Sequence, residues 1–168
     1  MNKLTMPGLI ARIGIWLALA FVFNLIWEIG HISLYTLWRE AAPPVIAWSI
    51  FHCTMGDVVI ALVVFAFAAI VLWRTDWPTS HPWSGGALVV VAALVFTAQS
   101  EWYNVYRSGA WGYTSSMPTI LGVGLSPLLQ WLILLPLMVT AYRKLVPLLV
   151  RQKSTSSISA NEIKRDKK

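Results

Sequence analysis

Four residues with polar or ionisable side chains interrupt the first long apolar segment of the sequence. Asn24, Glu28, His31 and Tyr35 follow one another at steps of four, three and four residues, which places them on one face of a helix. A carboxyl group in an apolar pocket holds its proton more tightly than one in water and can act as an acid near neutral pH. An imidazole beside it can relay protons. The spacing therefore predicts an acid–base site, with Glu28 and His31 among its catalytic residues.

Two further apolar segments carry ionisable residues that extend this site. Asp57 lies in one and Glu101 in the next, and we expect Glu28 and Glu101 to act as acid and base while Asp57 and His31 tune or relay protons. His52 and Asp57 lie about 140° apart around a helix, so both line one pocket only if the pocket wraps around that helix. The predicted substrate-binding residues are polar or aromatic side chains of the same regions: Asn24, His52, Asn104, Trp102, Trp111, Tyr113 and Gln130.

The same residue types also allow a metal site. Glu28-Ile29-Gly30-His31 has the Glu-x-x-His spacing that di-iron helix bundles use, and carboxylate and imidazole ligands suit iron, zinc or manganese. This alternative takes its ligands from the whole ionisable set: Glu28, His31, His52, Asp57 and Glu101. A second Glu-x-x-His pair is absent from the sequence, because Asn104 stands three residues after Glu101. The sequence by itself identifies no particular cofactor.

The composition places these residues in a membrane protein. Of the 168 residues, 57% are hydrophobic and 12% are charged, whereas a soluble domain has about 25% charged residues. Four apolar segments are long enough to cross a hydrocarbon core of about 30 Å as helices; they cover about residues 11–37, 45–73, 86–106 and 121–142. We predict an all-α, polytopic integral membrane domain over residues 1–150, followed by a disordered basic cytoplasmic tail over residues 151–168.

The distribution of basic residues predicts the orientation. With the N-terminus inside, eleven Lys and Arg residues lie on the inner side, and Arg39 and Arg107 lie outside. This bias predicts cytoplasmic N- and C-termini, with the polar residues of all four segments toward the outer leaflet. Tryptophans near the predicted inner interface, Trp73, Trp77 and Trp83, fit an aromatic belt. The net charge of +6 comes mostly from the tail, so no nucleic-acid partner is expected.

Several motifs resemble those of small bacterial membrane proteins of similar length. The motifs are Asn24-Leu25-Ile26-Trp27-Glu28, the segment from His52 to Asp57, Glu101-Trp102-Tyr103-Asn104, and Gly122-Val123-Gly124-Leu125-Ser126-Pro127-Leu128-Leu129-Gln130-Trp131. The resemblance covers about residues 20–140 and implies a four-helix fold in a bacterial inner membrane, but no activity.

A second resemblance implies chemistry. Trp111-Gly112-Tyr113, the glycine pair Gly122 and Gly124, and Leu125-Ser126-Pro127 are similar to the lycopene-cyclase-type domain and related membrane terpene cyclases. Those enzymes use membrane-embedded carboxylic acids to protonate an isoprenoid alkene or epoxide. The acidic residue that they carry after the proline is replaced here by Leu128, Leu129 and Gln130. The resemblance implies a cyclase- or isomerase-like enzyme with an isoprenoid or other lipidic substrate.

Other interpretations of these residues stay open at this stage. A charged side chain at the bilayer centre costs about 2.5–3.5 kcal/mol on insertion scales, but Glu28 or Asp57 could instead be hydrated at the interface. Asp57 could also pair with a histidine as a structural contact, and the tryptophans could be interface anchors. A non-enzymatic role as a pigment- or quinone-binding, transport or assembly subunit is the third function class. Membrane lipids are the expected surroundings, and a homo-oligomer or a membrane complex is compatible with the composition.

Overall fold

The computed structural model describes the backbone of residues 6–165 and the side chains of residues 8–148. Four of its helical segments are long and apolar enough to span a membrane, and they cover Gly8–Leu34, Pro43–Val71, Pro82–Ser108 and Leu125–Leu148. The predicted all-α fold with four membrane-spanning helices is therefore confirmed. Every predicted span overlaps one of these segments, and the boundaries differ by a few residues.

Short elements connect the long helices. The long helices and their extensions are α1 (Met6–His31) with the 3-10 helix η1 (Ile32–Leu34), α3 (Pro43–Val71), α5 (Pro82–Trp102) with the π-helix η2 (Tyr103–Ser108), and α6 (Leu125–Arg165). The connecting elements are α2 (Leu37–Glu40), α4 (Trp77–Ser80), β1 (Thr119–Ile120) and β2 (Val123–Gly124). Prolines stand in the first turns of α3, α4 and α5, where a fixed φ and a missing N–H carry no cost.

The segment between η2 and α6 contains two turns that need left-handed backbone. Gly109, with φ of 64°, ends η2, as glycine commonly does after a helix. β1 and β2 pair antiparallel through a two-residue loop in which Leu121 and Gly122 have φ of 52° and 82°, the pattern of a type I′ hairpin turn. The Tyr106 hydroxyl donates a hydrogen bond to the Gly122 carbonyl oxygen at 2.7 Å. These contacts give the segment a definite shape beside the site.

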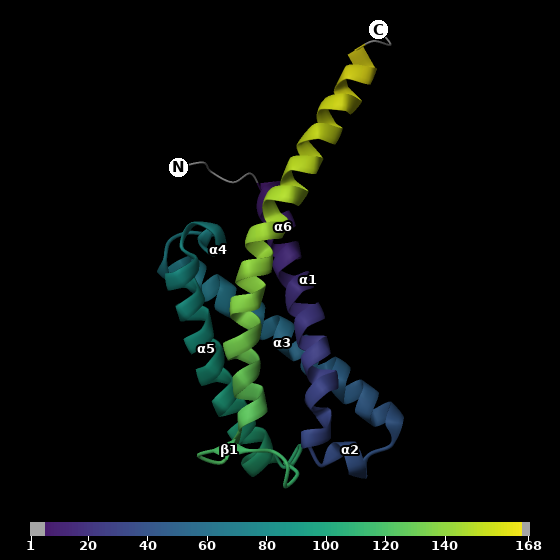
Figure 1. Ribbon diagram of the computed structural model, residues 1–168, viewed down its shortest axis with the longest axis vertical. Coiled ribbons are helices and arrows are strands. Elements are labelled where there is room, and N and C mark those ends of the chain that lie inside the picture. The colour runs from purple at the N-terminus through teal and green to yellow at the C-terminus, as the bar shows by residue number, and fades with distance from the viewer. Residues whose placement is uncertain (1–5, 166–168) are drawn as a thin grey trace.

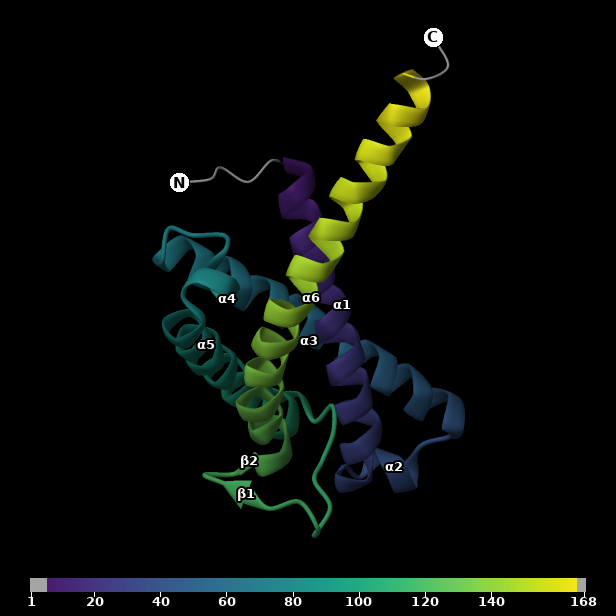
Figure 2. The ribbon, with the colours of Figure 1, turned by 45° about the horizontal axis from the view of Figure 1, so that its top comes forward.

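The four long helices form a bundle in which α3 crosses the others at a steep angle (Figure 1). The start of α1 and the C-terminal part of α6 lie at one end, and α2 and the β1–β2 hairpin lie at the opposite end, which we call the hairpin end. Figure 2 shows that the N-terminal half of α3 extends away from α5, whereas its C-terminal half approaches α4.

The best-packed part of the bundle is centred on Trp16 of α1, which is fully buried. Its indole N–H donates a hydrogen bond to the Ala61 carbonyl oxygen at 3.0 Å, and its ring lies 5.3–5.8 Å from those of Phe65, Trp77 and Tyr142. An indole N–H buried among apolar groups needs such an acceptor. Trp77, predicted to lie near the inner interface, is instead fully buried in this cluster.

The helix α6 is assigned as far as Arg165. The domain boundary predicted near residue 150, with a disordered cytoplasmic tail from Arg151, stays a prediction. Two prolines, Pro136 and Pro147, are accommodated inside this helix.

Replacing Gly85 with alanine is expected to lower the free energy of unfolding by about 1–3 kcal/mol, the usual cost of overpacking. A Cβ at Gly85 would overlap with ring atoms of Trp77, whose indole N–H is held by the Phe65 carbonyl oxygen at 3.2 Å. Gly86→Ala is the matched control, because a Cβ there meets no atom within 4 Å. Thermal unfolding of both variants in detergent checks this, and equal stability would contradict the packing of Trp77 against α5.

Candidate active site

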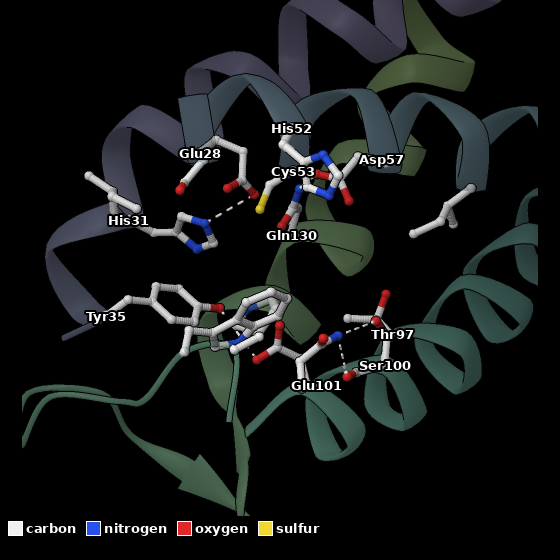
Figure 3. A pocket seen from close by; sticks show the side chains of 18 of the residues that line it. Glu28, His31, Tyr35, His52, Cys53, Asp57, Thr97, Ser100, Glu101 and Gln130 are labelled. Atoms are coloured by element: carbon white, nitrogen blue, oxygen red, sulfur yellow. Dashed lines mark hydrogen bonds and ion pairs between the residues drawn. The ribbon is translucent and has the colours of Figure 1, made fainter. Parts of the chain in front are cut away.

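A pocket with a volume of about 560 Å³ lies at the hairpin end of the bundle. Its walls come from α1, α3, α5, η2 and α6 and from the segment that follows η2 (Figure 3). The volume falls in the range of sites for small ligands. The polar and ionisable side chains of the lining are Glu28, His31, Tyr35, Ser49, His52, Cys53, Asp57, Thr97, Ser100, Glu101, Asn104 and Gln130.

Glu28 and His31 form the part of the pocket that α1 contributes. The His31 Nε2 atom lies 3.1 Å from a Glu28 carboxyl oxygen, and His31 Nδ1 lies 2.9 Å from the Ser126 hydroxyl oxygen of α6. A neutral imidazole satisfies both contacts when Nε2–H donates to Glu28 and Nδ1 accepts the hydroxyl proton. These two contacts connect the buried carboxyl group of Glu28 to the buried hydroxyl group of Ser126 through the His31 imidazole, which can exchange protons.

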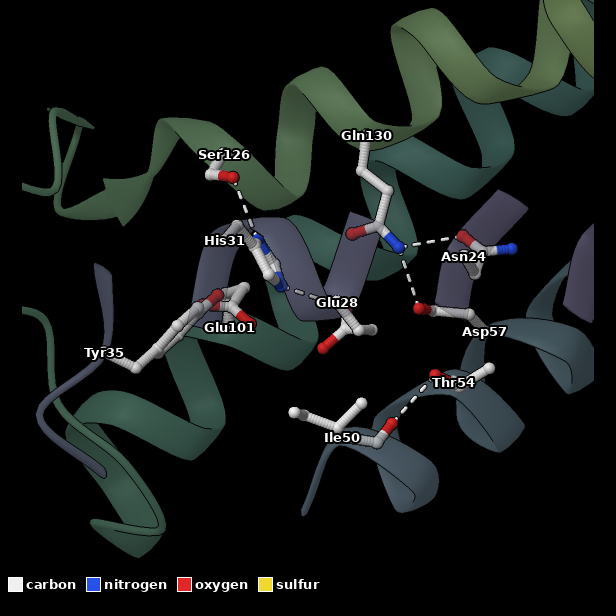
Figure 4. A network of polar contacts seen from close by, with 10 residues as sticks. All are labelled: Asn24, Glu28, His31, Tyr35, Ile50, Thr54, Asp57, Glu101, Ser126 and Gln130. Atoms are coloured by element: carbon white, nitrogen blue, oxygen red, sulfur yellow. Dashed lines mark hydrogen bonds and ion pairs between the residues drawn. The ribbon is translucent and has the colours of Figure 1, made fainter. Parts of the chain in front are cut away.

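Asp57 extends this network from α3. The Gln130 amide donates hydrogen bonds to Asp57 and to the Asn24 side-chain oxygen, each at 2.8 Å (Figure 4). Asn24 in turn donates to the Ala20 carbonyl oxygen at 2.7 Å. Side chains of α1, α3 and α6 therefore meet in one polar network.

Glu101 of α5 lies on the other side of the pocket from Glu28 and Asp57 (Figure 3). Its carboxylate accepts a hydrogen bond from the Tyr113 hydroxyl at 2.6 Å and a longer one from the Tyr35 hydroxyl at 3.5 Å. The Gly124 backbone N–H donates to the Tyr113 oxygen at 3.0 Å. Burial raises the pKa of Tyr113, and the hydrogen bond to Glu101 raises it further, so the hydroxyl keeps its proton as a donor. Glu101 is thus held by donors, in contrast to Glu28, which lies beside a second carboxyl group.

The structure brings all four predicted catalytic residues, Glu28, His31, Asp57 and Glu101, into the lining of this pocket. Of the predicted substrate-binding residues, four line it: His52, Asn104, Trp111 and Gln130. Asn24 is fully buried behind Gln130, and Tyr113 reaches the pocket through Glu101. Trp102 is the exception. Its side chain is 52% exposed and lies outside the lining, because the residue after Glu101 points about 100° away around the helix.

The predicted metal ligands do not form a metal-binding group. Within the part of the chain that the structure describes, no three His, Cys, Asp or Glu side chains lie close enough together to hold a metal ion. Glu28 contacts His31, His31 contacts Ser126, and Asp57 accepts a hydrogen bond from Gln130. Glu101 interacts with tyrosines on the opposite wall. The metal alternative is therefore not supported by the side-chain positions.

Tyr35 and Ser126 contact the catalytic candidates but were not predicted as site residues. Tyr35 belongs to the polar face of the first span, four residues after His31, but its spacing predicts no role for it. Ser126 is a polar residue near the start of the fourth span, and its contact with His31, 95 positions away, does not follow from spacing. Thr97 also lines the pocket, and its buried hydroxyl oxygen has no hydrogen-bond partner among the described residues.

Comparison with protein-family models, with curated proteins and with solved structures gives no match for this chain.

Proposed function

We propose that the protein is a membrane-embedded enzyme that isomerises or cyclises an unsaturated, isoprenoid-type lipid by general acid–base catalysis. The observation that carries the proposal is the presence of two differently held carboxyl groups on opposite sides of one pocket. Environments that separate the proton affinities of two such groups mark an acid and a base. The resemblance to membrane terpene cyclases at Trp111-Gly112-Tyr113 and Leu125-Ser126-Pro127 supports the choice of substrate class.

Glu28 is the proposed acid. Its carboxyl group and that of Asp57 line the same pocket, across from Glu101, and carboxyl groups that lie close together favour a state in which one of them keeps its proton. The proton passes from Glu28 to one carbon of a substrate C=C bond, and the neighbouring carbon becomes a carbocation. Trp111, whose ring lines the pocket, can face this cation and stabilise it through its π-system.

Glu101 is the proposed base. Its carboxylate accepts hydrogen bonds from Tyr113 and Tyr35, which stabilise the ionised form. It removes a proton from a carbon beside the cation, so a new C=C bond forms, either directly or after ring closure. The product has the same atoms as the substrate, and no oxidant or reductant is needed. His31 and Ser126 provide a relay that can return a proton to Glu28.

Replacing Glu101 with glutamine tests this proposal. Neutral lipids are extracted from cells with and without the wild-type protein and compared by liquid chromatography and mass spectrometry. In cells with the protein, we expect one lipid to decrease and an isomer of the same mass to appear. Glu101→Gln should abolish this conversion, because glutamine cannot accept the proton. Glu40→Gln is the control, since Glu40 is an exposed carboxylate of α2 outside the pocket. An isomer that forms equally with Glu101→Gln would rule out the assigned base.

We also propose that both termini are cytoplasmic in a bacterial inner membrane, with the pocket toward the outer leaflet. The eleven-to-two distribution of Lys and Arg supports this orientation. An alkaline phosphatase reporter, which is active only in the periplasm, should be inactive after Lys168 and active when inserted at Ser115 between η2 and β1. Activity at Lys168 with inactivity at Ser115 would reverse the orientation.

A further inference from the structure

The hairpin end of the pocket is covered by backbone from two distant parts of the chain. The Thr36 N–H donates to the Gly112 carbonyl oxygen, and the Thr114 N–H donates to the Leu34 carbonyl oxygen, both at 2.9 Å. Tyr35 and Tyr113 form an antiparallel bridge between these contacts. Tyr35 and Leu37 from one of these parts and Ala110 and Trp111 from the other line the pocket. The pocket is therefore bounded at this end by two segments, residues 34–36 and 112–114, that are hydrogen-bonded to each other.

The side of the pocket between α3 and α5 is open. Trp48 and Val59 of α3 and Phe96 of α5 line the pocket, yet they are 63%, 57% and 53% exposed. The two helices share a buried core farther along, at Phe65 and Ala68 with Val89 and Ala93, and the N-terminal half of α3 extends away from α5 (Figure 2). The rim is thus formed by membrane-spanning helices.

The opening reaches the depth of the lipid chains. Phe96 precedes Ser108, the last residue of this span, by twelve residues, or about 18 Å at 1.5 Å per residue of helix. Half of a hydrocarbon core is about 15 Å thick. The rim at Val59 and Phe96 is therefore in contact with acyl chains, and an apolar molecule can reach the pocket without leaving the bilayer.

The charges of the lining restrict what can bind. Three carboxyl groups, Glu28, Asp57 and Glu101, and the two histidines His31 and His52 face the pocket, whereas no lysine or arginine of the described residues lines it. A phosphate or carboxylate would be desolvated beside like charges, without a cation to pair with. Two uncharged donors of the lining, the Thr97 hydroxyl and the Trp111 indole N–H, are buried and have no partner among the described residues. Thr97 is only 7% exposed. It suits a neutral oxygen atom of a ligand.

We propose that the pocket binds an uncharged, lipid-soluble molecule with a neutral oxygen function, which enters from the bilayer between α3 and α5. This inference rests on the proposed function, because it specifies the class of substrate that the proposed active site binds. Diphosphate and phosphate esters of the same chains are excluded by the charge of the lining. Thr97 provides the hydrogen bond to the ligand oxygen.

A photoreactive analogue of farnesol, placed in vesicles with the reconstituted protein, tests this binding. We expect light-induced labelling of pocket peptides, identified by mass spectrometry, and at least tenfold stronger competition by farnesol than by farnesyl phosphate at equal membrane concentration. Gly56→Trp should reduce labelling at least tenfold, because Gly56 lines the open side and a Cβ there meets no atom within 4 Å. Gly30→Trp is the matched control, with equal space on α1 outside the pocket.

Two results would overturn the inference. In the first, farnesyl phosphate reduces the labelling as strongly as farnesol does; in the second, a folded Gly56→Trp variant is labelled as strongly as the wild type. The competition experiment uses the wild-type protein, so it decides the charge preference even if Gly56→Trp fails to fold. The proposed function can fail separately. If the probe labels the pocket but no lipid is converted, the enzymatic function is rejected and the binding site is supported. Glu101→Gln should retain labelling while conversion is lost.

Discussion

Glu28→Gln is expected to slow conversion of the lipid substrate by about 10²–10⁴-fold, the usual contribution of a positioned acid. The stability of the protein should be unchanged or higher. Glutamine keeps the volume of Glu28 and can still hydrogen-bond to His31, which lies 3.1 Å away. It also removes a buried ionisable group from an apolar environment. What it cannot do is give up a proton to a substrate carbon.

The opposite pattern would assign Glu28 to the scaffold. If the Glu28 carboxylate mainly stabilises the fold through His31, its replacement leaves the imidazole without its charged partner and lowers the free energy of unfolding by about 1–3 kcal/mol. Thermal unfolding in detergent and lipid conversion in membranes, measured on the same preparations, separate the two cases. Glu40→Gln serves as the control in both measurements, since Glu40 is exposed on α2. Lower stability with retained conversion would contradict the role of Glu28 as acid.

Gln130→Ala is expected to lower the free energy of unfolding by about 2–4 kcal/mol. Gln130 is only 2% exposed, and its amide donates to both Asn24 and Asp57. Alanine would leave two buried acceptors without a donor, at about 1–3 kcal/mol each. Of the contacts described between α6 and α1–α3 in this network, only that of Ser126 with His31 would remain.

Gln99→Ala is the comparison for this substitution, because Gln99 is an exposed glutamine of α5. Chemical or thermal unfolding of the two variants in the same detergent should show a large loss of stability for Gln130→Ala and a change within about 0.5 kcal/mol for Gln99→Ala. Equal stability of the two variants would mean that the Gln130 hydrogen bonds do not hold the helices together.

The number and position of the spans could be predicted because apolar length alone determines them. Each long helix overlaps a run of apolar residues between proline- or glycine-containing breaks. The steep crossing of α3 could not be predicted, because it follows from packing around Trp16 and from indole hydrogen bonds to backbone atoms 45 and 12 residues away. For the same reason the sequence placed Trp77 at an interface when it is a core residue.

The ionisable part of the site could also be predicted, because such residues are rare in membrane spans and their helical spacing is regular. Glu28, His31, Asp57 and Glu101 line one pocket, and His52 and Asp57 both do so because the pocket extends around α3. The contacts that distinguish the carboxyl groups could not be predicted from the sequence. The bond from Tyr113 to Glu101 depends on a loop tied to residues 34–36, and that from Gln130 to Asp57 depends on how α6 meets α3.

Uptake of deuterium from solvent tests the central claim, acid–base isomerisation by the two carboxyl groups, most directly. Membranes that contain the protein are incubated in D₂O with neutral lipids from cells that lack it, and the lipids are analysed by mass spectrometry. The acid–base account predicts a product isomer with one carbon-bound deuterium, formed by the wild type and by Glu40→Gln but by neither Glu28→Gln nor Glu101→Gln. Unchanged lipids with the wild-type protein, or a deuterated isomer that both carboxyl variants form equally well, would contradict it.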